Sequence, residues 1–279
     1  VMTKTYDLTT GSLAKHFMRL AVPAAIGMLF STLYNVVDVF FAGMIGTDAQ
    51  AGLAISFQAF FIFVTIGFGL SAAMTALVGN AIGAKKTTDA SIIAAQGIGF
   101  AIVTSVLLIV AARFIGPHLL AIISTEGAYR KVGEAYFMIL ILSLPGFIMG
   151  YGLNGILQAQ GDTVSMQYAL IGAFFANIGL NPLMMFGIPG IWGGLGFDGI
   201  AAATVISQTS VMVYIGFRLM RSGVLVAKTL TNILPNLSLY RQILAQLLPT
   251  TFTMLVMFTA GFIVQFYLKT FGTPAVAAY

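Results

Sequence analysis

Seven stretches of this sequence are each long and apolar enough to cross the hydrocarbon core of a bilayer as a helix, which takes about 20 residues. They lie near 20–45, 51–79, 90–113, 135–158, 164–187, 199–220 and 243–268. Backbone groups in lipid must pair with one another, and only helices or closed barrels achieve this. Because the runs are too long and continuous for barrel strands, the sequence predicts an all-α integral membrane protein.

Composition supports this class and excludes several others. Only 8% of the residues are charged, whereas soluble domains average about 25%. The chain has no Cys, so disulfides, thiolate metal sites and cysteine nucleophiles are excluded. The two His, His16 and His118, lie outside the apolar cores, and no Ser/His/Asp set, HExxH motif or phosphate-binding glycine loop is present. We therefore expect neither an enzyme nor a resident cofactor.

Basic residues predict the orientation of the chain and its partners. If the N-terminus lies in the cytoplasm, nine Lys and Arg fall in inner segments and four, Arg113, Arg130, Lys131 and Lys269, in outer ones. This excess favours a multi-pass protein of the cell (inner) membrane with a cytoplasmic N-terminus. Since the basic residues lie between the apolar spans, we expect the lipid bilayer as a partner and no nucleic acid.

An internal repeat predicts the domain organisation. A shift of 226 residues aligns Pro23 with Pro249 and gives eight identities across 20–53, including Gly46-Thr47 with Gly272-Thr273. Six helices separate the copies, so the halves would be parallel repeats. We expect a six-helix lobe at 1–222, a cytoplasmic linker at 223–241, which lies within a polar connection at 221–242, and at 242–279 the first helix of a truncated second lobe. The missing C-terminal lobe would be a partner in cis.

The first span carries a polar stripe. Ser31, Tyr34, Asn35 and Asp38 recur at spacings of three and four, so they share one helix face, and Met28 extends it. A charged group at membrane depth is costly and generally faces a protein or water-filled interior. The stripe indicates either a functional carboxyl at Asp38 or a structural Asp satisfied by amides and hydroxyls.

The fifth span offers a second polar corner. Asn177 and Asn181 lie one turn apart, and Pro182 frees the carbonyl of Ile178. Together they could coordinate a cation. Alternatively, the two amides join neighbouring helices and the proline only bends the helix.

Two further spans add polar faces. The fourth carries Tyr151, Asn154 and Gln158, and the sixth carries Thr204 and Gln208. Four of the first six spans therefore turn a polar side toward a shared interior, which predicts a water-accessible cavity. The tripeptide Gly161-Asp162-Thr163, after the fourth span, reads as a turn with a helix N-cap.

In order and spacing, these motifs resemble the multidrug and toxic compound extrusion (MATE) transporters. The matching stretches are Pro23 with Tyr34–Gly43, Gln158–Thr163, Asn177–Pro182 and Gly199–Thr204. The resemblance covers nearly the whole chain. It implies a twelve-helix fold of two six-helix lobes around a central cleft, and efflux of amphipathic, cationic compounds in exchange for H⁺ or Na⁺.

The resemblance also implies residue roles. Asp38 corresponds to the carboxylate that binds the coupling ion, H⁺ or Na⁺, with Asn177, Thr204 and the backbone at Ile200 as neighbours. Tyr34 and Asn154 correspond to residues that line the substrate cavity. We expect the same cavity to be lined also by Met28, Ser31, Asn35, Tyr151 and Gln208. Many relatives have a second acid where this chain has Asn181, so a two-carboxylate proton site is in doubt.

Two alternatives remain open from the sequence. A lipid-linked oligosaccharide flippase of the same superfamily would need basic residues to meet pyrophosphate, and none lies deep in a span. A seven-helix receptor matches the number of spans. However, a cytoplasmic N-terminus would place the C-terminal end of the seventh helix outside the cell, which is opposite to the orientation of such receptors. The sequence favours a secondary antiporter of small molecules.

Overall fold

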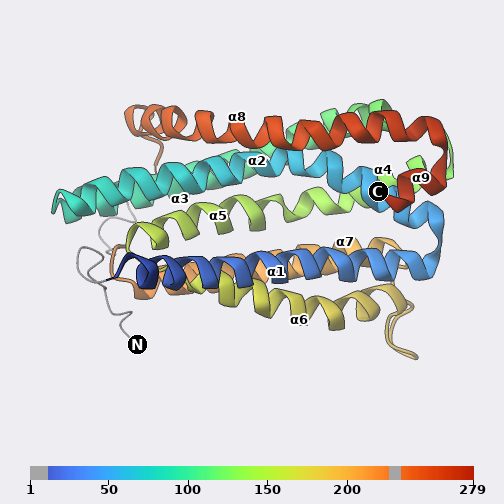
Figure 1. Cartoon of the computed structure of the whole chain (residues 1–279), viewed down its shortest axis with the longest axis horizontal. Coiled ribbons are helices and arrows are strands. Elements are labelled where there is room, and N and C mark those ends of the chain that lie inside the picture. Colours follow the sequence, from blue (N-terminus) through green and yellow to red (C-terminus); the bar gives the residue numbers. More distant parts are fainter. Residues whose placement is uncertain (1–11, 226–233) are drawn as a thin grey trace.

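The computed structural model describes residues 12–225 and 234–279 and is a bundle of long helices running side by side (Figure 1). Seven segments of the described chain are long and apolar enough to span a membrane. The helices, in chain order, are α1 (Leu13–Ile45), α2 (Thr47–Gly83), α3 (Thr87–Ile123), α4 (Ala128–Leu140), α5 (Leu144–Ala159), α6 (Ser165–Phe186), α7 (Asp198–Arg221), α8 (Leu237–Leu268) and α9 (Thr273–Ala278). The predicted all-α membrane fold is confirmed.

The core lies around α2, which packs against α3, α4, α5 and α8. The helices α6 and α7 pack against each other, and α1 packs against α6. Figure 1 shows α1, α6 and α7 on one side of α5, and α2, α3 and α8 on the other. We call the end of the bundle at which α1 begins and α7 ends the base (left in Figure 1), and the opposite end the top.

The fourth span is divided into two helices. A short 3₁₀ turn at Ile141–Ser143 separates α4 from α5, and Pro145 stands at the start of α5. Proline has no N–H to donate to the carbonyl four residues earlier, so the α-helical ladder cannot continue unbroken through this position. The Leu144 amide instead donates to the Ile141 carbonyl, and the Ser143 hydroxyl donates to the Leu140 carbonyl at 2.6 Å.

Two predicted connections are shorter in the structure. The connection between the spans expected at 90–113 and 135–158 is largely helical, because α3 continues to Ile123 through Pro117 and α4 begins at Ala128. The linker expected at 223–241 ends earlier, since α8 begins at Leu237; residues 226–233 lie outside the described part. The Asn236 side chain accepts from the amides of Ser238 and Leu239, which starts α8 before its apolar stretch.

The aligned residues of the internal repeat occupy matching places in the fold. Pro23 and Pro249 both lie inside long helices. Gly46 and Gly272 both have positive φ, 146° and 89°, and each is followed by a helix that begins at the aligned Thr. The turn at the top of α1 therefore recurs after α8.

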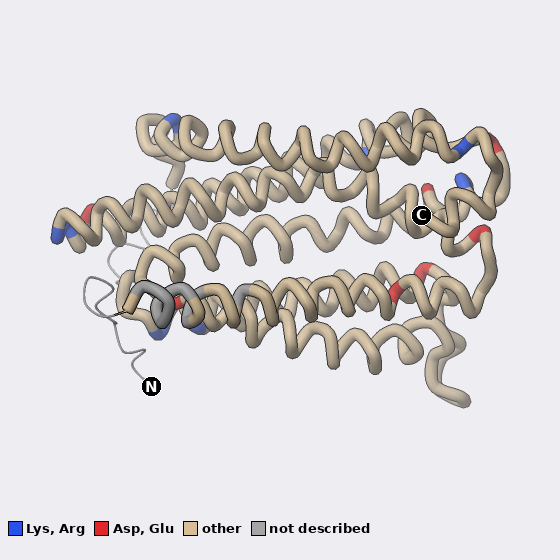
Figure 2. The backbone as a smooth tube through the Cα atoms, in the orientation of Figure 1, with Lys and Arg blue, Asp and Glu red and all other residues tan. Residues whose placement is uncertain are grey.

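Charged residues are concentrated toward the two ends of the bundle, and the long middle of most helices carries none (Figure 2). Such a distribution keeps ionised groups at the level of the lipid headgroups and water. Asp38 is an exception, because it lies well inside α1.

Candidate functional site

Asp38 is completely buried, and side chains from α6 and α7 surround its carboxylate. Its Oδ1 accepts hydrogen bonds from Asn181 Nδ2 at 2.8 Å and from Asn177 Nδ2 at 3.0 Å. Its Oδ2 lies 3.4 Å from Thr204 Oγ1, which is a long hydrogen bond. Three helices thus meet at one carboxylate, and their donors compensate part of the cost of burying it.

The amide pair forms because α6 places Asn177 and Asn181 one turn apart on the same face. Asn181 Nδ2 also donates to Asn177 Oδ1 at 3.0 Å, which holds both amides facing α1. The Asn181 Oδ1 atom is buried and has no hydrogen-bond partner among the described residues. The site therefore contains a carboxylate and a free amide oxygen. No described Lys or Arg forms an ion pair with Asp38.

A second contact joins this site to the interior of the lobe. The Tyr34 hydroxyl donates to Thr204 Oγ1 at 3.2 Å, so Thr204 lies between Tyr34 and Asp38. Ile200 is buried one turn before Thr204 on α7, and none of the described hydrogen bonds connects it to Asp38. The structure thus brings Asp38, Asn177, Asn181 and Thr204 together and leaves Ile200 as an adjacent packing residue.

An aromatic cavity adjoins the carboxylate site. It has a volume of about 100 Å³, and its polar lining includes five of the residues expected from the sequence. These are Ser31, Tyr34, Asn35, Tyr151 and Gln208. Because Tyr34 and Thr204 line this cavity and also contact each other, the cavity and the Asp38 site share a wall.

Two other expected lining residues do not border this cavity. Met28 is 74% exposed on α1. It lies one turn closer to the base than Ser31, which is the lining residue of α1 nearest the base. Asn154 is 5% exposed and lies one turn beyond Tyr151 on α5. Both share a helix face with lining residues, but helical spacing does not show how far along the face a cavity extends.

The cavity has walls that our sequence analysis did not identify. Phenylalanines from α2 and α5 supply them: Phe57, Phe60, Phe61, Phe68 and Phe147. A signal was available, since Phe57, Phe61 and Phe68 recur on one face of α2. However, aromatic residues on one face of an apolar membrane span are more simply interpreted as residues that pack against neighbouring helices.

Tyr136 is a further residue that the sequence analysis missed. It is completely buried on α4, and its hydroxyl has no hydrogen-bond partner among the described residues. Its ring stacks on Phe197 with centroids 4.7 Å apart, and it lies close enough to Asp38 and Tyr34 for electrostatic interaction. A hydroxyl near a buried carboxylate is a candidate member of the site.

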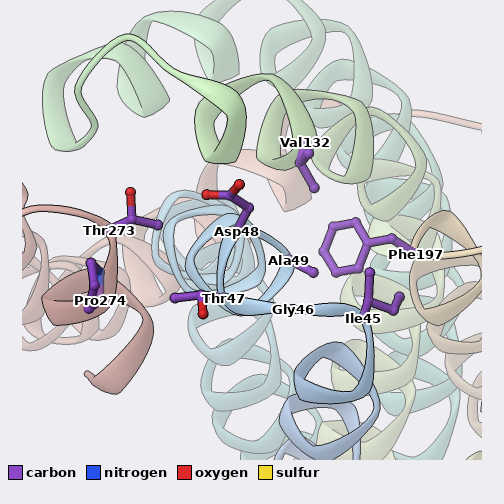
Figure 3. Close-up of a pocket in the computed structure, with 9 residues that line it drawn as sticks. All are labelled: Ile45, Gly46, Thr47, Asp48, Ala49, Val132, Phe197, Thr273 and Pro274. Carbon is purple, nitrogen blue, oxygen red and sulfur yellow. The ribbon is translucent and has the colours of Figure 1, made fainter.

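Phe197 also forms a wall of a pocket at the top of the bundle (Figure 3). The pocket has a volume of about 510 Å³ and lies between the α1–α2 turn, α4 and the start of α9. Asp48 projects into the region between Val132 and Thr273 (Figure 3). The stacked pair of Phe197 and Tyr136 thus stands between this pocket and the surroundings of Asp38.

The order of these elements can be compared with known proteins. The profile of the MatE family matches residues 23–183 of this chain, which include Asp38, Asn177 and Asn181. The chain belongs to the MatE family. This membership sets aside the seven-helix receptor, since the matched region covers more than half of the chain.

Curated members of the MatE family resemble the chain along almost all its length. The multidrug export protein MepA of Staphylococcus saprophyticus is 21% identical over 277 residues, covering 98% of this chain and 60% of that protein. MepA of Staphylococcus aureus strain MRSA252 is 22% identical over 268 residues, covering 95% and 58%. The chain therefore spans about 60% of the length of these relatives.

Solved MATE structures share the fold. An inward-facing multidrug resistance MATE transporter of the MOP superfamily superposes with a TM-score of 0.79 at 22% identity, covering 92% of this chain and 59% of that one. An outward-facing structure gives the same TM-score of 0.79 at 24% identity, covering 96% and 59%. This region of the fold therefore has the same architecture in both conformations.

Proposed function

We propose that this chain forms the ion-coupled lobe of a secondary antiporter that exports amphipathic, cationic small molecules in exchange for H⁺ or Na⁺. The observation that supports this most directly is Asp38, a fully buried carboxylate with hydrogen-bond donors around it but no cationic side chain paired with it among the described residues. An ionised carboxylate without a counter-ion in such a place is costly. Binding a proton or a sodium ion removes that cost.

The surrounding groups suit either ion. For Na⁺, oxygen ligands are available at Asp38 and at the unpartnered Asn181 Oδ1. For H⁺, Asp38 alone would be the acceptor, because an amide does not protonate in this pH range. No group of three or more His, Cys, Asp or Glu that could hold a metal lies within the described residues. A sodium site would therefore depend on one carboxylate and neutral oxygens.

Ion binding at Asp38 can be coupled to substrate binding because Thr204 and Tyr34 lie between the carboxylate and the aromatic cavity. When Asp38 binds an ion, its Oδ1 and Oδ2 become weaker acceptors for Asn177, Asn181 and Thr204, and those donors change partners. Thr204 also accepts from Tyr34, which lines the cavity. Ion binding thus alters the cavity through one hydrogen bond. The ion and the substrate need only prefer different conformations for each to drive the other.

The chemistry of the cavity supports a cationic cargo. Five Phe and two Tyr surround it, and none of the described Lys or Arg residues lines it. Aromatic faces attract cations, whereas a pyrophosphate-linked oligosaccharide would need basic side chains, which disfavours the flippase alternative. The cavity measures about 100 Å³, and drug-sized ligands occupy about 300–1,000 Å³. We therefore expect the second lobe to supply the rest of the binding cleft.

The test is transport by the complete gene product in proteoliposomes. A fluorescent hydrophobic cation serves as cargo, and the pH and Na⁺ gradients are imposed separately to identify the ion. We expect Asp38→Asn to reduce ion-driven efflux at least about tenfold, as removal of a functional ligand does. The matched control is Asp48→Asn, in the pocket at the top, which we expect to transport normally. Wild-type efflux in Asp38→Asn would refute the role of Asp38.

A further inference from the structure

A groove lies on the outside of the lobe, behind the aromatic cavity, with which it shares Ala173 as a lining residue. It runs between α6 and α7 and has a volume of about 340 Å³. Small residues of α6 form one side and hydroxyl-bearing residues of α7 much of the other. The lining residues include Tyr168, Gly172, Ala176, Ser210, Val211 and Tyr214. Gly172 and Tyr168 are exposed, so the groove opens toward the surroundings of the bundle.

The groove leads toward the base of the bundle. On α7, Ser207, Ser210, Tyr214 and Arg221 recur at spacings that place them on one helix face. Arg221 lies seven residues beyond Tyr214, which is about 10 Å along the helix. On α6, Tyr168 is the fourth residue of the helix. One end of the groove is therefore at the level where the helices reach the headgroup region, where tyrosines are common in membrane proteins.

Positive charge lies beyond the base end of the groove rather than among its lining residues. Arg221 is exposed, its guanidinium lies 4.2 Å from the centre of the Phe217 ring, and no carboxylate pairs with it among the described residues. Arg218 lies one turn earlier and binds Asp162 at 3.1 Å. The sequence of α6 contains no acid, and Asp198, the single acid of α7, lies at the opposite end of that helix.

We propose that this groove binds an anionic phospholipid, with one acyl chain along Gly172 and Ala176 and the phosphate near Arg221. An apolar channel that ends at an unpaired arginine matches a molecule with an apolar tail and a negative head. The other occupant of comparable shape is a hydrophobic cation of the kind proposed as cargo. Arg221, beyond the base end of the groove, repels such a cation, whereas no described Lys or Arg lines the inner aromatic cavity.

Photolabelling tests the proposal directly. The purified protein is placed in phosphatidylcholine nanodiscs containing a trace of phosphatidylglycerol with a diazirine in its acyl chain, or the same label on phosphatidylcholine. We expect peptides from 168–176 and 207–214 to be labelled roughly fivefold more by phosphatidylglycerol, the factor that one interfacial arginine contributes. Equal labelling by the two lipids, or labelling spread evenly over all membrane-facing helices, would overturn the proposal.

Matched variants identify the groove and the charge. A Cβ at Gly172 or at Gly179 meets no atom within 4 Å, so both positions have open space where a side chain would begin. Gly172→Leu fills the groove and should reduce the phosphatidylglycerol labelling several-fold, while Gly179→Leu, two turns along α6, should not. Arg221→Gln should remove the preference for phosphatidylglycerol, and Arg221→Lys should keep most of it. Unchanged labelling in Gly172→Leu would refute the site, and competition by tetraphenylphosphonium would assign the groove to cargo instead.

Discussion

Asp162 joins the base of α6 to the base of α7. Its Oδ1 accepts from the amides of Val164 and Ser165, and its Oδ2 from the Ser165 hydroxyl at 2.6 Å and Arg218 at 3.1 Å. The predicted turn with a cap is therefore confirmed, with an added arginine from α7. Burial alone would raise the pKa of Asp162, but the hydrogen bonds from Ser165, Arg218 and Val164 together hold its pKa below the usual value for a carboxyl.

The first prediction concerns acid stability. A pKa lowered by folding means that Asp162 stabilises the protein fully above its unfolded-state pKa, about 4. That stabilisation is lost as the pH falls below 4 and through the lower folded-state value. We expect Asp162→Asn to cost about 1–3 kcal/mol near pH 7 and to weaken the loss of stability below pH 4. Thermal unfolding in detergent across this pH range measures both.

A surface ion pair provides the control for Asp162. Arg130 and Glu134 lie one turn apart on α4 at 2.9 Å, with side chains 25% and 35% exposed. Exposed pairs of this kind contribute about 0.3–0.5 kcal/mol, so Glu134→Gln should leave the unfolding temperature nearly unchanged. A larger effect for Glu134→Gln than for Asp162→Asn would contradict the importance of the buried contact.

At the scale of elements, α2 and α5 approach closely at Gly155. A Cβ at this position would overlap the Ser71 carbonyl of α2. Nearby, Thr75 Oγ1 lies 2.8 Å from that carbonyl and 3.1 Å from the Gly155 carbonyl. Because the obstacle is the backbone of Ser71, moving a side chain aside cannot relieve the overlap. Small residues of this kind let membrane helices pack at short distance.

We therefore expect Gly155→Ala to destabilise the folded protein by about 1–3 kcal/mol through overpacking. Gly79→Ala on α2 is the matched control, since its Cβ would meet only the Ala159 Cβ at 3.9 Å. That variant should be neutral or slightly stabilising, as alanine favours helix over glycine. Thermal unfolding in detergent distinguishes them, and equal midpoints would show that the two helices are free to separate.

For the whole molecule, the distribution of basic residues predicts a cytoplasmic base. The chain contains no Cys, so single cysteines can be labelled without background. Ser222 is exposed after α7 at the base, and Glu126 is exposed between α3 and α4 at the top. In intact cells, an impermeant maleimide should label Glu126→Cys, and it should label Ser222→Cys only after permeabilisation. The reverse pattern would show that the N-terminus lies outside.

The sequence by itself determined the seven spans and the polar stripe that carries Asp38. These are local properties: hydropathy decides whether a segment enters lipid, and the helical period decides which residues share a face. The aligned turns at Gly46 and Gly272 follow from the same kind of pattern. Helix ends were less predictable, as at Ile123, because helices do not stop where the bilayer does.

Only the tertiary structure decided which polar faces meet. Asp38 and Asn177 are 139 residues apart in the chain, and no periodicity links them. The packing of α1 against α6 and α7 places two amides and a hydroxyl around one carboxylate, and leaves Ile200 without a hydrogen bond to it. The Phe residues of α2 and the buried Tyr136 enter the site for the same reason. Side-chain contacts depend on how helices rotate against one another, and that depends on shapes summed over the whole lobe.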